Sequence, residues 1–186
     1  MTFRWGILGT GYAARKFVLG LRQSSAGKAV LVASRNRANA QKFAHTFSIP
    51  MVADTYETCA DVTEVDAFYI ATPPTLHREQ ALLCISVGKP VLIEKPLAHN
   101  AHDAQAIINA ARDSQVFCME GMWTRFLPLV SHIKKLVQDG EIGMLRAFSG
   151  SFGKSNVPDK TQNVFNGDLG GGAMLLRGIY PLSMSF

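Results

Sequence analysis

Short runs of apolar residues alternate with longer amphipathic segments over the first two thirds of the chain. Six apolar runs have the length of buried strands, and they cover residues 3–8, 28–34, 51–53, 65–71, 90–93 and 116–120. Helical spacing of apolar residues appears between them, at 13–21, 37–47, 76–87 and 101–113. This alternation is typical of a parallel sheet covered by helices on both faces, so the sequence predicts a doubly wound α/β fold.

The alternation stops near residue 122. A helix is predicted at 129–138, a turn at Gly140–Gly143, a strand at 145–152 and the start of a helix at Ala173, with a loop rich in Gly, Asn and Asp from 153 to 172. One helix and one strand cannot bury a sheet face. We therefore expect a complete first domain over residues 1–122 and an incomplete second domain over residues 123–186.

Composition narrows the class of protein. Hydrophobic residues make up 47% of the 186 positions, enough for one substantial core, and every apolar run is shorter than the ~20 residues of a membrane span. The net charge of +5 is scattered and not interleaved with aromatic residues, which argues against nucleic acid and leaves open a small phosphorylated ligand. We expect a cytoplasmic protein, because the N-terminus enters a strand without a signal-like segment. The three cysteines are widely spaced, and we expect them to be reduced.

A glycine turn follows the first predicted strand, in the segment Gly9-Thr10-Gly11-Tyr12-Ala13-Ala14. In such a turn the first glycine allows a tight bend, the second lets the backbone approach a pyrophosphate, and the small third residue lets the helix pack on the strand. The helix N-terminus then faces the anion. The motif also occurs for packing alone, but its place on the first strand of a βαβ unit favours a dinucleotide site.

The end of the second strand indicates which dinucleotide. A carboxylate there binds the ribose 2′-hydroxyl of NAD, but the residues present are Ser34-Arg35-Asn36-Arg37. A guanidinium binds a phosphate bidentately, so Arg35, with Ser34, favours NADP over NAD. Arg37 is either a second phosphate contact or an ordinary solvated residue.

Glu94-Lys95-Pro96 ends another strand at the sheet edge where open α/β sheets bind ligands. A lysine beside a nicotinamide can stabilise the alkoxide that develops during hydride transfer, and Glu94 can orient it. The alternative is an ordinary strand end followed by a turn. His99 and His102 lack the further ligands of a metal site, so no metal is expected.

Several segments together resemble one family. They are Gly9-Thr10-Gly11, Val32-Ala33-Ser34-Arg35, Ala71-Thr72-Pro73-Pro74 with His77, Gly88-Lys89-Pro90-Val91-Leu92-Ile93-Glu94-Lys95-Pro96, Met119-Glu120-Gly121-Met122-Trp123-Thr124-Arg125-Phe126-Leu127-Pro128 and Phe152-Gly153-Lys154. In this order they resemble the glucose-fructose oxidoreductase / inositol dehydrogenase / MocA family, within it the branch of dimeric dihydrodiol dehydrogenase and NADP-dependent D-xylose dehydrogenase. The resemblance implies a Rossmann-type domain followed by the truncated start of an α+β open-sheet domain.

The resemblance also implies roles for residues. It implies that Lys95 is catalytic and followed by a cis prolyl bond, and that Glu94 lies near the nicotinamide ribose. Further cofactor contacts are implied at Ala71, Thr72, Pro73, Pro74, His77, Trp123 and Arg125, where Trp123 has domain packing as an alternative. In the second family signature, from Gly170 to Tyr180, Tyr180 matches the general acid/base. Leu176 replaces the usual aspartate of that signature, which puts turnover in doubt.

The resulting hypothesis is an NADP-dependent oxidoreductase that acts on the hydroxyl of a sugar, polyol or cyclic diol, here as an incomplete chain. Its partners are that small substrate and, in full-length relatives, a second copy in a homodimer, with no nucleic acid and no membrane. Two alternatives stay open. One is a non-catalytic nucleotide-binding protein, and the other is an inactive fragment that does not accumulate in folded form because the strand at 145–152 exposes apolar surface.

Overall fold

Six parallel strands form the centre of the first part of the protein in the computed structural model, which describes residues 2–155 and 163–186. They are β1 (Phe3–Leu8), β2 (Gly27–Ala33), β3 (Met51–Val52), β4 (Ala67–Ile70), β5 (Val91–Ile93) and β6 (Cys118–Glu120). Their order in the sheet is β3-β2-β1-β4-β5-β6, and every neighbouring pair is parallel. The predicted doubly wound sheet is confirmed, with its reversal of strand order between β1 and β4.

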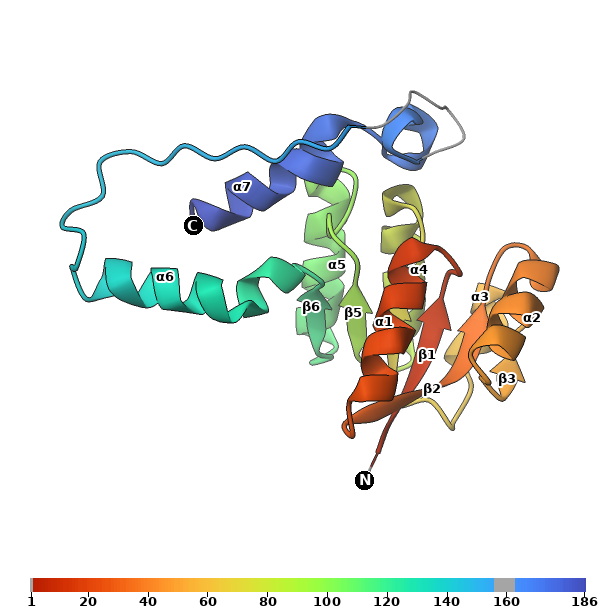
Figure 1. Ribbon diagram of the computed structural model, residues 1–186. Helices are drawn as coiled ribbons and strands as arrows, with labels where there is room; N and C mark the ends of the chain where they lie inside the picture. Colours follow the sequence, from red (N-terminus) through yellow and green to blue (C-terminus); the bar gives the residue numbers. More distant parts are fainter. Residues whose placement is uncertain (1, 156–162) are drawn as a thin grey trace. The chain divides into compact units, whose positions relative to one another are not determined.

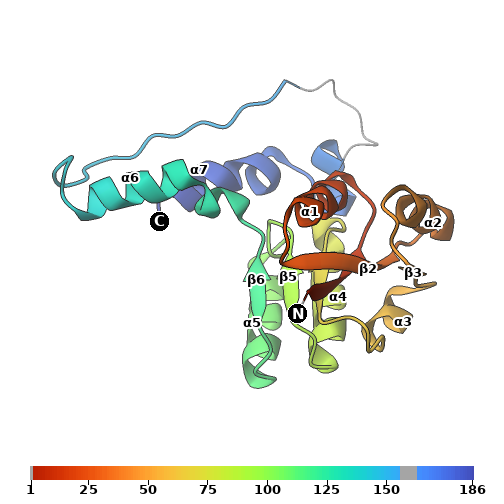
Figure 2. The same cartoon turned by 60° about the horizontal axis from the view of Figure 1, so that its bottom comes forward.

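Helices cover both faces of this sheet (Figures 1 and 2). On one face α1 (Tyr12–Gln23) and α2 (Arg37–Thr46) contribute to a core with Ile7 and Val32. On the opposite face α3 (Tyr56–Ala60), α4 (His77–Ser86) and α5 (Ala101–Asp113) contribute to a core around Leu8 and Phe68. Neighbouring strand residues such as Ile7 and Leu8 serve opposite cores because side chains alternate across a strand.

Side-chain caps fix where several helices begin. The Asn36 and Asn100 side chains accept the backbone N–H groups of Asn39 and Asp103, at 3.1 and 2.8 Å, and so start α2 and α5. At α1 the capping position is Gly11, which has no side chain to accept a first-turn N–H. The amides of the first turn of α1 therefore remain available to an anion.

The chain divides into two compact units, Met1–Glu120 and Gly121–Phe186. The described elements of the second unit are α6 (Pro128–Gln138), a π-helical turn (Met174–Gly178), α7 (Ile179–Met184) and the short 3-10 turns at Trp123–Phe126, Asn163–Phe165 and Gly167–Leu169. The helices predicted at 129–138 and from Ala173 are confirmed. Part of the predicted 153–172 loop, residues 156–162, lies outside the described residues.

The strand predicted at 145–152 is wrong. This segment has no regular secondary structure, and its apolar side chains Leu145, Phe148 and Phe152 are about half exposed. A β-strand needs a neighbour to pair its backbone groups, and within residues 121–155 and 163–186 there is no other strand. The segment therefore has the sequence pattern of a strand but no neighbouring strand to pair with among these residues.

The three cysteines are free thiols, with Cys59 and Cys84 buried and Cys118 partly buried. Burial raises the pKa of Cys59 to about 12 and that of Cys118 to about 11, so these thiols are protonated at neutral pH. Among the helices described, none has the length and apolar character needed to cross a bilayer.

Candidate functional site at the carboxyl edge of the sheet

Backbone hydrogen bonds hold the loops after the central strands together. Beyond the strand ends, the N–H of Gly9 donates to Ala33 O, that of Ala71 to Leu8 O, and that of Glu94 to Ile70 O, each at 2.8 Å. Because all strands are parallel, these loops meet at one edge. The structure thus brings together the glycine turn, the loops after β2 and β4, and the Glu94-Lys95-Pro96 corner.

The two glycines of the turn meet different surroundings. Gly9 has φ of +103°, and a Cβ there would lie 2.6 Å from the carbonyl oxygen of Ala71, so only glycine fits. A Cβ on Gly11 would meet no atom within 4 Å. Ala14 is fully buried and lets α1 approach the sheet, whereas Tyr12 is exposed and Ala13 partly so. The open space at Gly11, next to uncapped amides of α1, fits a dinucleotide pyrophosphate.

The loop after β2 carries two arginines in different settings. Arg35 is exposed and lines a cavity of about 750 Å³ with Tyr56, Leu76 and Gln80. Arg37 is paired instead with Asp54, with Nε 3.1 Å from Oδ1. The partly buried Ser34 hydroxyl accepts the N–H of Asn36 at 3.4 Å. Arg35 is therefore the better placed of the two guanidiniums to meet a phosphate.

His77 joins the loop after β4 to the loop after β5. It is fully buried, with Nε2 2.9 Å from Thr72 O and Nδ1 3.0 Å from Pro96 O. Burial lowers the pKa of His77, and the contacts with backbone carbonyls oppose that shift. The Pro73-Pro74 pair precedes this histidine, with Pro74 buried at the start of the 3-10 turn Pro74–Leu76. His77 thus acts inside the scaffold, where it holds two loops of the site.

The Glu94-Lys95-Pro96 corner has the expected cis bond between Lys95 and Pro96. The Tyr69 hydroxyl donates to Glu94 Oε1 at 2.5 Å. Burial raises the pKa of Glu94, opposed by Tyr69 and the charge of Lys95, and burial together with Glu94 also raises the pKa of Tyr69. Lys95 itself is partly buried. The corner is thus a partly desolvated group of ionisable side chains, the kind of environment found at catalytic sites.

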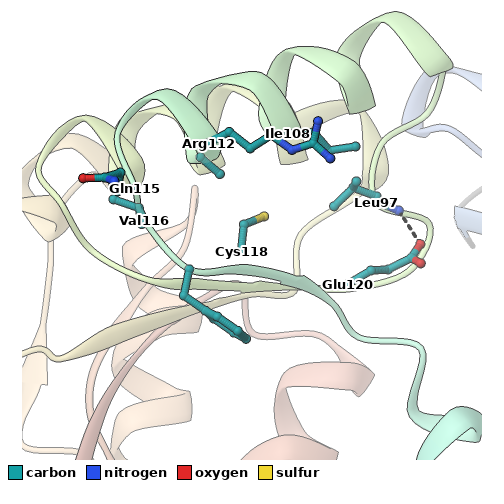
Figure 3. Close-up of a pocket in the computed structure, with 9 residues that line it drawn as sticks. Leu97, Ile108, Arg112, Gln115, Val116, Cys118 and Glu120 are labelled. Atoms are coloured by element: carbon teal, nitrogen blue, oxygen red, sulfur yellow. Dashed lines mark hydrogen bonds between the residues drawn. The ribbon is translucent and has the colours of Figure 1, made fainter.

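A further pocket of about 490 Å³ lies beside this corner, between α5 and β6 (Figure 3). At its end nearest the corner, Glu120 Oε1 accepts the N–H of Leu97 at 2.8 Å. The wall is mostly apolar, and Arg112 and Glu120 are its charged residues. Its thiol, Cys118, is protonated at neutral pH, so the pocket offers no thiolate nucleophile.

Tyr180 lies in an aromatic group within the second unit. The indole Nε1 of Trp123 donates to the Tyr180 hydroxyl at 3.2 Å, and the Phe152 ring centroid is 4.8 Å from that of Tyr180. The Arg125 Nε donates to Ser183 Oγ at 2.9 Å. Leu176 is in the π-helical turn, and the Arg177 guanidinium lies 5.9 Å from the Phe152 ring centroid. The three predicted residues of this unit, Trp123, Arg125 and Tyr180, thus share one region.

Some site residues were missed at the sequence level. Tyr69 is hydrogen-bonded to Glu94 of the corner, and Glu120 to Leu97 just after it. Tyr56 and Gln80 lie beside the Arg35 loop, and Asp54 pairs with Arg37. Tyr69 and Glu120 lie at or near the carboxyl ends of parallel strands, so their position was a usable signal. For Tyr56 and Gln80 no sequence signal was available, since their contacts with the loops join elements that are not neighbours in a motif.

Comparison with known protein families fits this geometry. The model described as "Oxidoreductase family, NAD-binding Rossmann fold", GFO_IDH_MocA, matches residues 3–122, and the GFO/IDH/MocA C-terminal domain model matches residues 130–185. The chain belongs to this family. It is an oxidoreductase family whose members carry an NAD(P)-binding Rossmann domain, which confirms the resemblance inferred from the sequence.

Two curated relatives share a name. Trans-1,2-dihydrobenzene-1,2-diol dehydrogenase of Danio rerio is 40% identical over 97% of this chain, and that of Mus musculus is 38% identical over 100%. The chain covers 54% and 57% of these relatives, about half their length. Among solved structures, a 3-ketoreductase from Actinomadura kijaniata with NADP and TDP-benzene has a TM-score of 0.89 at 28% identity, covering 98% of this chain and 56% of its own. Levoglucosan dehydrogenase with NADH and levoglucosan shares the fold, with a TM-score of 0.91 at 23% identity over 100% of this chain and 53% of its own.

Proposed function

We propose that the chain is the NADP-binding part of an oxidoreductase that transfers a hydride between the nicotinamide and a hydroxyl or carbonyl of a sugar, polyol or cyclic diol. The observation that carries the cofactor choice is the end of β2, where Arg35 lines an open cavity and residues 34–37 include no carboxylate. An arginine binds the 2′-phosphate of NADP, whereas NAD requires an acceptor for its 2′-hydroxyl. The 3-ketoreductase with bound NADP is a relative consistent with this choice.

In this proposal the rest of the cofactor lies along the carboxyl edge of the sheet. The pyrophosphate lies over Gly9 and Gly11 at the start of α1, with Tyr12, Ala13 and Ala14 around it, and the nicotinamide lies towards Thr72, Pro73 and Glu94. The cofactor supplies a hydride acceptor and donor at C4 of its nicotinamide.

The chain's own residues supply the proton chemistry. The Lys95 ammonium stabilises the alkoxide as it develops, Tyr180 exchanges the hydroxyl proton, and Glu94 orients Lys95. Trp123 and Arg125 approach the nicotinamide end of the cofactor in this proposal, and His77 supports the cofactor loops through its contacts with Thr72 O and Pro96 O. We also propose a domain boundary at 122/123 and a cytoplasmic location. A homodimer of the full-length form is proposed from the resemblance to the branch of dimeric dihydrodiol dehydrogenase.

Titration of the purified chain with NADPH and with NADH tests the cofactor proposal. We expect NADPH to bind more tightly and to raise the melting temperature. Substitution Arg35→Ala removes charge-assisted hydrogen bonds to phosphate and should weaken NADPH by about 10-fold or more while sparing NADH. Arg37→Ala is the matched control, because Arg37 is paired with Asp54. Retention of the full NADPH preference by Arg35→Ala contradicts the proposal.

A second candidate function, nucleotide binding without turnover, is favoured by Leu176 at the position where the family has aspartate. Assays of the protein with NADP and a panel of diols and pentoses distinguish the two. If the unaltered protein binds NADPH but forms no product, and Leu176→Asp restores product formation, the second candidate is supported. The site then has a catalytic ancestry and has lost turnover through Leu176. Product formation by the unaltered protein excludes this second candidate.

A further inference from the structure

Tyr56 contacts the loop that carries Arg35 although it belongs to another element. Its hydroxyl accepts the backbone N–H of Arg35 at 3.2 Å. Tyr56 is the first residue of α3, whose start is held by a reciprocal cap in which Thr58 N–H donates to Thr55 Oγ1 and Thr55 N–H donates to Thr58 Oγ1. The cap therefore fixes the backbone position from which the Tyr56 side chain extends.

The Arg35 N–H lies beyond the sheet ladder. β2 ends at Ala33, so the peptide of Arg35 has left the strand pairing that fixes the residues before it. Tyr56 supplies an acceptor at this point, and its phenol is half-buried, with burial raising its pKa. The phenol is thus a neutral, partly desolvated group that holds one peptide of an exposed loop.

Tyr56 also shares a cavity with a residue that holds the loop after β4. Gln80 on α4 is 2% exposed, and its Oε1 accepts the Thr72 hydroxyl at 2.6 Å. Hydrogen bonding from the Gln80 side chain and the Arg35 backbone opposes the rise in the pKa of Tyr56. Tyr56, Gln80 and Arg35 line the same cavity of about 750 Å³. The phenol that holds the loop after β2 thus lines the same cavity as the buried amide that holds the loop after β4.

We infer that Tyr56 is a positioning residue for cofactor choice, which fixes the backbone of Arg35 so that the guanidinium meets the 2′-phosphate of NADP. The inference rests on the proposed function, because it presupposes that Arg35 reads that phosphate. Bidentate binding of a phosphate depends on the position and plane of the guanidinium. NADH has no 2′-phosphate, so movement of Arg35 leaves its affinity nearly unchanged.

The test compares Tyr56→Phe with the unaltered 186-residue chain by titration with NADPH and NADH. Phenylalanine keeps the ring and removes the hydroxyl alone. We expect NADPH affinity to fall about 3- to 10-fold, the effect of losing one hydrogen bond, with NADH within twofold. Thr46→Ala is the matched control, since it removes a different hydroxyl, which donates to Lys42 O at 2.8 Å in α2. It should leave the NADPH/NADH ratio unchanged.

A double-mutant cycle shows whether Tyr56 acts through Arg35. In an Arg35→Ala background, Tyr56→Phe should no longer change the NADPH/NADH ratio. The inference is overturned if Tyr56→Phe leaves the ratio unchanged, weakens both nucleotides equally, or acts as strongly without Arg35. If the unaltered chain shows no NADPH preference, the proposed function fails first, and this inference fails with it. A preference that depends on Arg35 and not on Tyr56 overturns the inference alone.

Discussion

The same added methyl group should destabilise the fold at Gly9 and leave its stability nearly unchanged at Gly11. At Gly9 an alanine must adopt φ of +103° with its Cβ 2.6 Å from the backbone oxygen of Ala71. Left-handed strain of about 1–3 kcal/mol and displacement of the Ala71 peptide together give a loss of about 3 kcal/mol in the free energy of unfolding. At Gly11, with φ of −77° and open space, Gly11→Ala should change that free energy by no more than about 0.5 kcal/mol.

Urea denaturation followed by far-UV circular dichroism measures both effects. Gly9→Ala should lower the urea midpoint by about 1–2 M, given an m-value of about 2 kcal/mol/M. Gly11→Ala should keep the midpoint and lose at least about tenfold in NADPH affinity, because its methyl enters the space given to the pyrophosphate. Equal destabilisation by the two variants refutes the steric argument. Unchanged NADPH binding by Gly11→Ala refutes the placement of the cofactor over this turn.

Three further predictions concern stability. Asn100→Ala removes the cap of α5 and should cost about 1 kcal/mol in thermal unfolding, with Asn109→Ala, on the exposed side of the same helix, as its control; equal melting temperatures contradict the capping role. Ile107→Ala removes a fully buried side chain and should cost about 2–5 kcal/mol, while Ile107→Val costs about 1 kcal/mol; a smaller loss for alanine than for valine contradicts the packing. Burial raises the pKa of Glu94, so its contribution to stability is fully present below the unfolded-state pKa of about 4.3 and is lost as pH rises through the folded-state pKa. The urea midpoint of Glu94→Gln should therefore rise relative to that of the unaltered protein as pH increases from 4.5 to 7.5. A difference in midpoint that stays constant across this range overturns the assignment.

The sequence was informative where local pattern and sheet geometry agree. The apolar run from Phe3 to Leu8 and the helix from Ala101 to Asp113 have the predicted bounds, because burial and capping are both visible in neighbouring residues. The helix α3 was missed because five residues are too few to show helical periodicity. The strand predicted at 145–152 failed because pairing depends on a neighbouring strand that periodicity does not reveal.

The site was predictable to a similar extent. Gly9, Arg35 and Glu94 follow strand ends, so the parallel topology alone places them at one edge. The Arg37–Asp54 pair and the Tyr56–Arg35 hydrogen bond join elements separated in the sequence, and they depend on distances that no motif encodes. For that reason the sequence left Arg37 open as a phosphate contact.

The backbone bonds that continue the sheet past Gly9, Ala71 and Glu94 have a consequence for how quickly a nucleotide is captured. These three amides are outside the strands yet bonded like strand residues, so they should exchange with deuterium about as slowly as the core and not at loop rates. A surface that is already in its bound shape loses little chain entropy when a ligand arrives. Association should therefore be a single, concentration-dependent step in stopped-flow traces, without a slow loop closure after the encounter.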